Sequence, residues 1–437
     1  MKKINNSVLA LALFVGIANA NAQEKKTLTL DDAVQLGIQN SKNLKIDAAK
    51  IEEATANLLE AKNRQLPELK ISGSYMYLPL KPNIDIKLPG VSGAGGPEVH
   101  QVAYGSANVS VPIYSGGRIK YGIESAKYLV EASKLTTEND KVAIAYNVAQ
   151  AYNNLFKANQ SIKVLEENLT ASQKRDETFL KLENNGVIAR NDRLKASLQT
   201  SNIELQLLEA KNNYNIANIN MDLLLGLPET TEIEVDQNYI DEGNEVKPLE
   251  FYLNEARENR KDLQALDKQR QAAALGTKSA KAENLPSIAF TGGYVAADIP
   301  KFLTIYNAVN VGVGISYNLS NLWKENSSLK QSQAREMQLA ATNELLNDNL
   351  KLDVNREYQN TDYSKKRIAV FEKSAEQANE NYRITKNKYD NGLATMTELL
   401  DADAAQISAN VGVINAKADA ALAYRKLLQT TGTLTNK

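Results

Sequence analysis

The residue types that most often perform chemistry are either missing from this sequence or scattered along it. The 437 residues include no cysteine and a single histidine, His100. The lack of cysteine excludes disulfides, cysteine metal sites and a lipid-modified N-terminal cysteine. His100 has no companion ligands nearby, so we expect no metal there. No nucleophile motif or phosphate loop occurs, and the many acids lie on long predicted helices. We therefore expect neither an enzyme nor a cofactor.

The charge balance argues against a nucleic-acid partner. The chain has 51 Lys and Arg against 52 Asp and Glu, for a formal net charge of -1. Loss of the lysines at positions 2 and 3 with a signal peptide would make it -3. No basic block is present, so no nucleic acid is expected as a partner.

The N-terminus has the pattern of a secretory signal peptide. Lys2 and Lys3 precede a mostly apolar run over 8–18, and small residues follow at Ala18, Ala20 and Ala22. We predict a signal peptide over residues 1–22, with Gln23 first in the mature chain. The alternative is an uncleaved anchor, but no stop-transfer pattern follows. Beyond residue 22 no apolar run approaches the roughly 18 residues of a spanning helix, so membrane entry would require strands.

The sequence contains an internal repeat in which the proline and glycine positions recur. Leu66-Pro67 returns as Leu285-Pro286, and Ser72-Gly73-Ser74-Tyr75 returns as Thr291-Gly292-Gly293-Tyr294, both 219 residues later. Farther on, Gly186 returns as Gly392 at an offset of 206. The offset falls from 219 to 206, so the second copy has lost 13 residues. A deletion confined to one loop is what a duplicated fold tolerates most easily. We predict two repeats, over residues 23–229 and 230–437.

Each repeat is predicted to hold the same elements in the same order. A proline follows the first helical segment and opens a strand, and a second strand leads into a long helical segment. The first repeat has helices over about 30–65 and 118–225 and strands over about 68–78 and 101–114. The second has helices over about 249–284 and 324–429 and strands over about 287–296 and 306–319, with a turn around Asp298-Ile299-Pro300. A short strand is expected over 231–235, between the repeats.

The predicted strands alternate between apolar and small or polar residues. Val309, Val311 and Val313 alternate with Asn310 and Gly312. A period of two suits a sheet with lipid on one side and water on the other. A half-buried soluble hairpin would give the same alternation, so the pattern alone leaves both possibilities open.

The long helical segments cannot fold as a globule. Residues 118–184 contain no proline, which at about 1.5 Å per residue allows roughly 100 Å of helix. A helix of this length must lie along neighbours. The seam expected to face those neighbours steps by three and four residues, as in a coiled coil. It consists of Ala145, Val148, Tyr152, Leu155, Asn159, Ile162, Glu166 and Leu169.

Four strands are too few for a membrane barrel, because about eight are needed to close one. An open edge in lipid would leave backbone groups unpaired, at a cost of several kcal/mol each. If the strands enter a membrane, the chain must therefore oligomerise. Three copies would give twelve strands and a cylinder of coiled coils.

At the level of motifs, the chain resembles the outer-membrane channel family of TolC over roughly residues 25–434. The resemblance rests on the duplicated order, on the strand-to-helix junction at 111–118 (Val-Pro-Ile-Tyr-Ser-Gly-Gly-Arg) and on the turn at 389–393 (Tyr-Asp-Asn-Gly-Leu). It implies an α+β membrane protein: a homotrimer with a 12-stranded transmembrane β-barrel, a periplasmic α-helical coiled-coil barrel and a small equatorial domain. It also implies location in the outer membrane and its lipid, with the helical part in the periplasm. The implied partners are a periplasmic adaptor (membrane fusion protein) and an inner-membrane transporter.

The resemblance also assigns candidate pore residues. Glu398 and Asp401 match the two acids that line the periplasmic mouth of the family, where three copies would attract cations. Two solvated acids near a helix N-terminus are the alternative. Tyr389 and Asp192 match two residues of the family's closed gate. The position of its arginine is Ala394 here, and Arg190 is a candidate substitute.

The two helical turns resemble the family's tips, which meet the adaptor. Two tips per chain would give six per trimer. The residues assigned to docking are Gly186, Val187, Ile188, Gly392, Leu393 and Ala394.

These features favour a trimeric exit channel of a tripartite efflux pump or type I secretion system. A passive outer-membrane porin would not need the long helices. A secreted coiled-coil structural or adhesion protein would leave the duplicated Leu-Pro strands unused. The sequence indicates no particular cargo.

Overall fold

The computed structural model describes residues 25–80, 82, 99–240, 245–300 and 302–435. The predicted signal peptide over 1–22 and its cleavage before Gln23 lie outside these residues. In the described part of the chain, none of the helices combines the length and the apolar character that a membrane span requires. The elements are β1 (Lys25–Leu28), α1 (Leu30–Asn40), α2 (Lys42–Asn63), β2 (Glu68–Tyr77), β3 (Gln101–Tyr114), α3 (Arg118–Asn184), α4 (Arg190–Leu225), β4 (Glu232–Val235), η1 (Gln237–Ile240), α5 (Leu249–Asn259), α6 (Lys261–Ala282), β5 (Ser287–Ile299), β6 (Leu303–Ser316), η2 (Leu319–Leu322), α7 (Ser327–Asp390) and α8 (Met396–Thr430).

The chain forms two compact units, and each unit combines segments of both predicted repeats. The helical unit comprises Met1–Lys45, Glu138–Arg260 and Asp348–Lys437, and the sheet unit comprises Ile46–Thr137 and Lys261–Asn347. The chain passes between the units within α2, α3 and α7 and between α5 and α6. The units therefore do not coincide with the repeats, and the repeat boundary at 229/230 stays a prediction.

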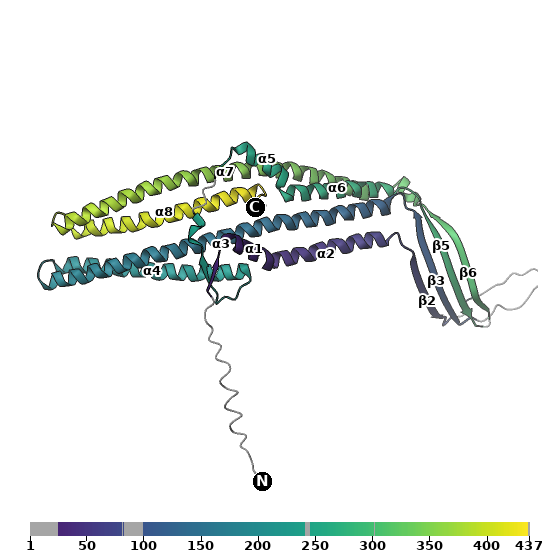
Figure 1. Ribbon diagram of the computed structural model, residues 1–437. Coiled ribbons are helices and arrows are strands. Elements are labelled where there is room, and N and C mark those ends of the chain that lie inside the picture. Colours follow the sequence, from purple (N-terminus) through teal and green to yellow (C-terminus); the bar gives the residue numbers. More distant parts are fainter. Residues whose placement is uncertain (1–24, 81, 83–98, 241–244, 301, 436–437) are drawn as a thin grey trace, which may run out of the picture. The chain divides into compact units, whose positions relative to one another are not determined.

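The sheet unit contains one antiparallel sheet with strand order β2-β3-β5-β6 (Figure 1). Residues paired across antiparallel strands share a face, and successive rows alternate between the two faces. One row is Lys70, Asn108, Gly293 and Asn310, and the next is Leu69, Val109, Gly292 and Val311. The rows thus separate a polar, small-residue face from an apolar face. On β6 the apolar face is 62% to 73% exposed, at Val309, Val311, Val313 and Ile315.

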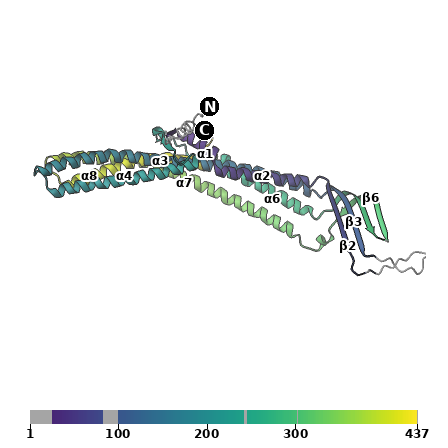
Figure 2. The same ribbon diagram turned by 90° about the horizontal axis from the view of Figure 1, so that it is seen from below.

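The outer strands of this sheet have one paired edge each. Within the described residues, β2 pairs with β3 and β6 pairs with β5, and neither has a second partner. Both therefore present a row of free backbone N–H and C=O groups, which is a template for another strand. Figure 2 shows the sheet from a second direction, with β2 at one margin and β6 at the other.

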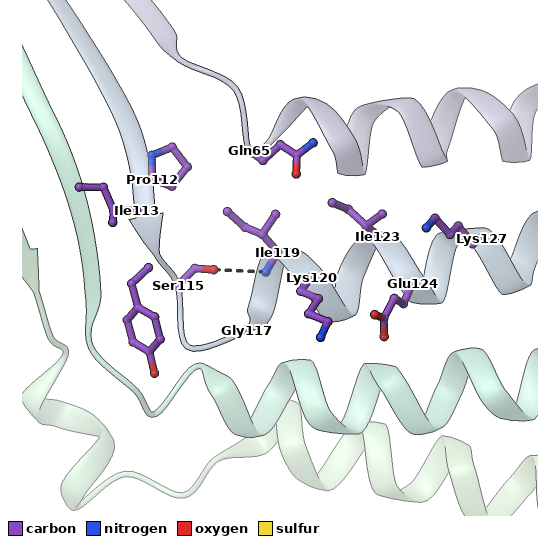
Figure 3. Close-up of a pocket in the computed structure, with 11 residues that line it drawn as sticks. Gln65, Pro112, Ile113, Ser115, Gly117, Ile119, Lys120, Ile123, Glu124 and Lys127 are labelled. Atoms are coloured by element: carbon purple, nitrogen blue, oxygen red, sulfur yellow. Dashed lines mark hydrogen bonds between the residues drawn. The ribbon is translucent and has the colours of Figure 1, made fainter.

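Two consecutive glycines build the junction between β3 and α3. Gly116 and Gly117 have φ of 64° and 89°, in the left-handed region that favours glycine. A Cβ at Gly116 would also lie 2.9 Å from the Cβ of Leu285. The Ser115 hydroxyl accepts a hydrogen bond from the Ile119 N–H at 3.4 Å (Figure 3). The Ser-Gly-Gly sequence of this junction is thus required by the abrupt change from strand to helix.

A cavity of about 470 Å³ lies beside this junction. Its apolar part comes from Pro112 and from Ile119 and Ile123 of α3 (Figure 3). Its charged part is Glu124 with two lysines, Lys120 and Lys127. One carboxylate between two ammonium groups is typical of a solvated helix face and is not a catalytic set.

In the helical unit, α3, α4, α7 and α8 run side by side (Figures 1 and 2). The core of this unit is organised around Tyr152 of α3. Its hydroxyl donates to the Leu28 carbonyl at 2.8 Å and accepts from the Asp236 N–H at 2.7 Å. These bonds tie α3 to the ends of β1 and β4, which pair in parallel. Burial raises the pKa of Tyr152 to about 12, so the phenol stays neutral.

The predicted seam of α3 is fully buried at one end, while at the other end Ile162 and Leu169 are part-buried against a second apolar cluster. Ala145, Val148, Tyr152 and Leu155 are each 0% exposed. Glu166, a polar member of the seam, is exposed and lies 2.9 Å from Lys211 of α4. Glu166 therefore faces solvent, where it pairs with Lys211 without the cost of burying a charge.

Three details differ from the sequence-based expectations. β5 continues to Ile299, so Asp298 lies in a strand and not in a turn; its carboxylate accepts from the Thr304 hydroxyl at 2.8 Å. β6 runs over Leu303–Ser316 and stops short of 319, because Asn318 caps η2 by accepting from the Ser320 N–H. β1 was not predicted, since four residues carry too little periodicity to be detected.

Candidate functional site at the tip end of the long helices

The turns from α3 to α4 and from α7 to α8 have the same backbone geometry. Gly186 and Gly392 have φ of 72° and 71°. The N–H groups of Val187 and Leu393 each donate to the carbonyl five residues earlier, at 2.9 Å and 2.8 Å. This is the Schellman arrangement, in which a left-handed glycine ends a helix. Apart from the glycine itself and its two chain neighbours, no heavy atom lies within 4 Å of a Cβ built at either position, so glycine is needed here for its conformation and not for space.

The turn residues divide into outward and inward members. Val187 is 66% exposed and Leu393 is 76% exposed, while Ala394 is half-buried. Ile188 packs against buried neighbours and does not project from the turn. The predicted docking surface thus presents Gly186, Val187, Gly392 and Leu393, and its role in docking stays a prediction.

An apolar cluster directly behind the turns joins all four long helices. We call it the tip cluster. Its buried members come from α3, α4 and α8, and part-buried neighbours add α7 and the first turn. The buried residues are Phe179, Ala196, Met396 and Leu399, and the neighbours are Leu182, Ile188, Tyr382, Tyr389 and Leu400. Each fully buried side chain of this size stabilises the packed state by about 1.5–3 kcal/mol.

Next to the tip cluster, a buried ion pair links α3 to α8. Arg175 Nη2 lies 2.7 Å from Asp403 Oδ2, and Arg175 Nη1 lies 3.2 Å from Asp403 Oδ1. The side chains are 14% and 7% exposed. Burial alone would lower the pKa of Arg175, but the hydrogen bonds and charge of Asp403 outweigh it and raise that pKa. The guanidinium therefore stays charged and bidentate.

Arg175 extends this link to the other two helices. Its Nη1 also donates to the Tyr382 hydroxyl of α7 at 3.4 Å, and its Nη2 donates to the Ser172 hydroxyl at 3.4 Å. Ser172 in turn lies 2.7 Å from the Thr200 hydroxyl of α4. Removing one partner from a buried ion pair costs about 3–5 kcal/mol, because the other charge is left buried and unpaired. We call these five residues the Arg175 network.

A second ion-pair group joins three of these helices, α3, α7 and α8, farther from the turns. Asp419 of α8 lies 2.9 Å from Lys157 of α3 and 3.4 Å from Arg367 of α7. About a third of each side chain is exposed. This group is more hydrated than the Arg175 network and contributes less to holding the helices together.

Two of the predicted gate residues, Tyr389 of α7 and Asp192 of α4, lie near one another. Tyr389 packs in the tip cluster, and burial together with the charges of Asp192 and Asp390 raises its pKa. Asp192 pairs with Lys195 at 3.5 Å. Arg190 is exposed, and no ion pair joins it to Asp192 in the described chain. The gate role of Arg190 stays a prediction.

The two predicted ring acids are exposed on the first turns of α8. Glu398 also closes a capping box: its carboxylate accepts from the Thr395 N–H at 2.7 Å, while the Thr395 hydroxyl accepts from the Glu398 N–H at 3.3 Å. The hydrogen bonds that this carboxylate accepts from the Thr395 N–H and from the Thr395 hydroxyl lower the pKa of Glu398, so it stays ionised at mildly acid pH. Asp401 lies one turn farther along the helix. Their role as pore rings stays a prediction.

No group of three or more His, Asp or Glu residues in the described part of the chain could hold a metal ion. His100 contributes its main-chain carbonyl, which accepts from the Leu78 N–H at 2.8 Å. The tip end of the helical unit combines an apolar cluster with a buried ion pair.

Sequence reasoning missed Arg175 and Asp403. A signal for Asp403 was present, since it lies midway between Leu399 and Ile407 on a face that is otherwise apolar. An acid at such a position requires a buried partner. Its partner is 228 residues away, so spacing along the chain could not identify it.

The comparisons with known proteins agree with this architecture. The outer-membrane channel OprN has a TM-score of 0.77 and 17% identity, over 92% of this chain and 90% of that one. The outer membrane protein VceC of Vibrio cholerae has a TM-score of 0.76 and 17% identity, over 92% and 96%. The transmembrane channel CusC has a TM-score of 0.77 and 19% identity, over 92% of each chain. At these identities the structures establish a shared fold.

The comparison with curated proteins gave no match. The sequence matches the outer membrane efflux protein family over residues 33–227 and 252–433. The two matched segments fall one in each predicted repeat and together cover most of the chain. The chain therefore belongs to the outer membrane efflux protein family.

Proposed function

We propose that this chain is the trimeric outer-membrane exit channel of a tripartite efflux pump or type I secretion system. Three copies form a 12-stranded barrel in the outer membrane, and the long helices form a tunnel in the periplasm. A periplasmic adaptor docks on the turns and connects the channel to an inner-membrane transporter. The channel passes small molecules or proteins outward and performs no chemistry on them.

The observation that carries this proposal is the four-stranded sheet with one apolar face and two unpaired edges. Val309, Val311 and Val313 are 62% to 70% exposed within the described part of the chain, and lipid suits such an apolar face. Because the sheet has an even number of antiparallel strands, β6 of one copy would run antiparallel to β2 of the next. Ring closure then pairs every free edge.

The helices support assembly in the same way. α4 carries apolar residues on the side turned away from its buried face, and α7 carries a comparable row. These residues are 41% to 68% exposed: Leu194, Leu198, Leu205 and Leu208 on α4, and Tyr363, Val370 and Ile384 on α7. Rows of this kind on long helices are the seams of helix–helix contacts.

Two experiments test the proposal. Purified outer membranes should yield a band that migrates as a trimer and converts to a monomer on heating. A soluble monomer in buffer without detergent would instead indicate a secreted coiled-coil protein. A deletion strain should gain drug susceptibility or lose particular secreted proteins; if neither changes while small-solute permeability falls, the chain is a passive porin.

A further inference from the structure

We infer that Lys70 forms an anion-binding ring in the lumen of the proposed barrel. Three copies of the chain contribute one ammonium group each, so the site is complete only in the assembled channel. Its ligands are multivalent anions, whose phosphate or carboxylate groups are attracted by the ammonium groups. The inference rests on the proposed trimeric channel, and it places a binding site on β2, apart from Glu398 and Asp401 of α8.

The first support is the distribution of charge over the four strands of the sheet. β2, β3, β5 and β6 together contain only three acidic or basic residues, Glu68, Lys70 and Asp298. Asp298 lies on the apolar face, because it is an even number of residues from Gly292 along β5. Lys70 is therefore the only basic residue on the polar face of these strands. In the proposed barrel the apolar face contacts lipid, so the polar face lines the lumen.

The second support is the row of residues around Lys70. Lys70 pairs with Asn108, and the row continues through Gly293 to Asn310. A Cβ at Gly293 would lie 2.8 Å from the Oδ1 atoms of both Asn108 and Asn310, so these two amide side chains approach each other over the glycine. The Asn108 Nδ2 also donates to the Ser106 hydroxyl at 3.1 Å. Lys70 thus stands among short, uncharged side chains and is the longest side chain of its row.

Glu68 is the acid nearest to Lys70 along this face. It lies two residues away on β2, about 6.8 Å along the strand. Within the described residues, no ion pair joins Glu68 to Lys70. Glu68 instead lines a cavity of about 890 Å³ where β3 joins α3, and the other charged residues of that cavity are Glu60, Arg64, Arg118 and Glu283. The carboxylate therefore has two guanidinium groups in its own cavity, and Lys70 is left exposed.

The third support is the size of the lumen that three copies would enclose. Twelve strands about 4.8 Å apart and tilted by about 40° form a backbone cylinder roughly 24 Å across. The axis then lies about 12 Å from the wall and nearer to the inward ammonium groups, which is close to the Debye length of about 8 Å at physiological ionic strength. A multivalent anion in the lumen is therefore attracted by all three lysines at once, as in pores that select anions with rings of basic side chains.

Block of the channel by anions tests the inference in planar bilayers. We expect inorganic tripolyphosphate and citrate to reduce the single-channel current reversibly at about 0.1 M salt and not at about 1 M, because the Debye length falls from about 10 Å to about 3 Å. Raffinose, a neutral sugar, should not block at either salt concentration. This comparison separates attraction by charge from obstruction by size.

Substitution of the lysine should remove the block. We expect Lys70→Gln to weaken it by roughly five-fold or more, because three ammonium groups about a Debye length from the anion are lost. Lys70→Arg keeps the charge and should retain the block. The matched control is Lys134→Gln, which removes an exposed lysine from α3 and should leave the block unchanged.

The absence of cysteine from the chain allows the charge to be changed within one folded channel. The Lys70→Cys channel should show the weak block of Lys70→Gln. Aminoethyl methanethiosulfonate returns an ammonium group to this position and should restore the block. Methyl methanethiosulfonate adds no charge and should not restore it.

Equal block of the Lys70→Gln and Lys134→Gln channels would overturn the inference. A wild-type channel that conducts and is blocked by neither anion would also overturn it, while the proposed channel would stand. If the wild-type chain forms no conducting trimer, the proposed function and the ring are overturned together, so the two failures are distinguishable.

Discussion

The ring of Tyr389 lies 5.9 Å from the ring of Phe179, at an interplanar angle of 60°. The contact joins α7 to α3 through carbon atoms, so the phenol hydroxyl is free to interact with the nearby charge of Asp192. A mutation that removes only the hydroxyl of Tyr389 can therefore separate the role of its ring in packing from the role of its hydroxyl in the predicted gate.

We predict that Tyr389→Phe with Asp192→Ala raises single-channel conductance in planar bilayers. The ring contact survives, but the phenol hydroxyl and the nearby carboxylate are both removed. An interaction of about 1 kcal/mol changes a closed-to-open ratio by about five-fold. Tyr363→Phe is the control, since that side chain is 64% exposed on α7. Equal conductance in both variants would remove Tyr389 and Asp192 from the gate.

Charge removal at the mouth should weaken cation selectivity. The double variant Glu398→Ala with Asp401→Ala removes both charges, but it also removes the capping box. Glu398→Gln with Asp401→Asn removes the charges alone, because glutamine keeps the capping box. We expect reversal potentials to show a lower cation preference. Thr395→Ala breaks the capping box and keeps both charges, so this variant should retain the cation preference. Unchanged selectivity in the neutral variant would exclude an acidic ring.

The pH dependence of this selectivity follows from the pKa of Glu398. Hydrogen bonds from Thr395 lower that pKa below the ordinary value of 4.5. The carboxylate is therefore charged above that value and loses its charge only as the pH falls through the lowered pKa. Selectivity measured from pH 7 downward should persist to pH 4.5. An earlier loss would show that Glu398 does not carry it.

Bulk at the turn should block coupling to the adaptor. We expect Gly392→Trp to abolish efflux while trimers remain intact. Gly392→Ala is the control, because both substitutions place a Cβ at φ of 71° and share a strain of about 1–2 kcal/mol. Leu393→Glu, at a 76% exposed position, should also abolish efflux without that strain. Normal efflux in the tryptophan variant would argue against docking at the turns.

The two faces of β6 should respond differently to charge. We predict that Val311→Arg prevents stable insertion into the outer membrane, since an arginine at mid-depth on a lipid face costs about 2–4 kcal/mol. Asn310→Arg, the next residue and on the opposite face, should be tolerated. The yield of heat-modifiable trimer measures both. Equal yields would mean that the apolar face does not contact lipid.

A buried acid near the end of α4 should destabilise the helical unit at neutral pH. Asp222 is 0% exposed, and its Oδ1 has no hydrogen-bond partner. Burial and the charge of Glu229 raise its pKa from 3.8 to about 6. The folded state thus holds a proton that the unfolded state releases, and stability falls as the pH rises from about 4 to about 6.

Asp222→Asn should therefore raise the melting temperature at pH 8 and leave it unchanged at pH 4. The gain is at most about 3 kcal/mol, from two pKa units. Glu229→Gln should give a smaller gain of the same sign. A gain at pH 4 equal to that at pH 8 would mean that ionisation of Asp222 is not the cause.

The parts of the fold with a strong local period could be predicted from the sequence. The alternation of Val309 and Val311 with Asn310 sets the two faces of β6, and the position of Gly392 sets a helical turn because few other residues adopt positive φ. The pairing of β1 with β4 could not be predicted, since it depends on contacts more than 200 residues apart. The same limit hid Arg175 and Asp403, whose partnership exists only after four helices have come together.

The core of the helical unit places Leu28 and Ala418 in one cluster. Such a core cannot close while the last helix is still being synthesised, because one of its walls does not yet exist. This core is therefore incomplete through most of translation. Its closure joins residues that lie nearly the whole chain apart, and contacts of such long range form slowly. Until Ala418 has been synthesised, the chain therefore lacks one wall of this core.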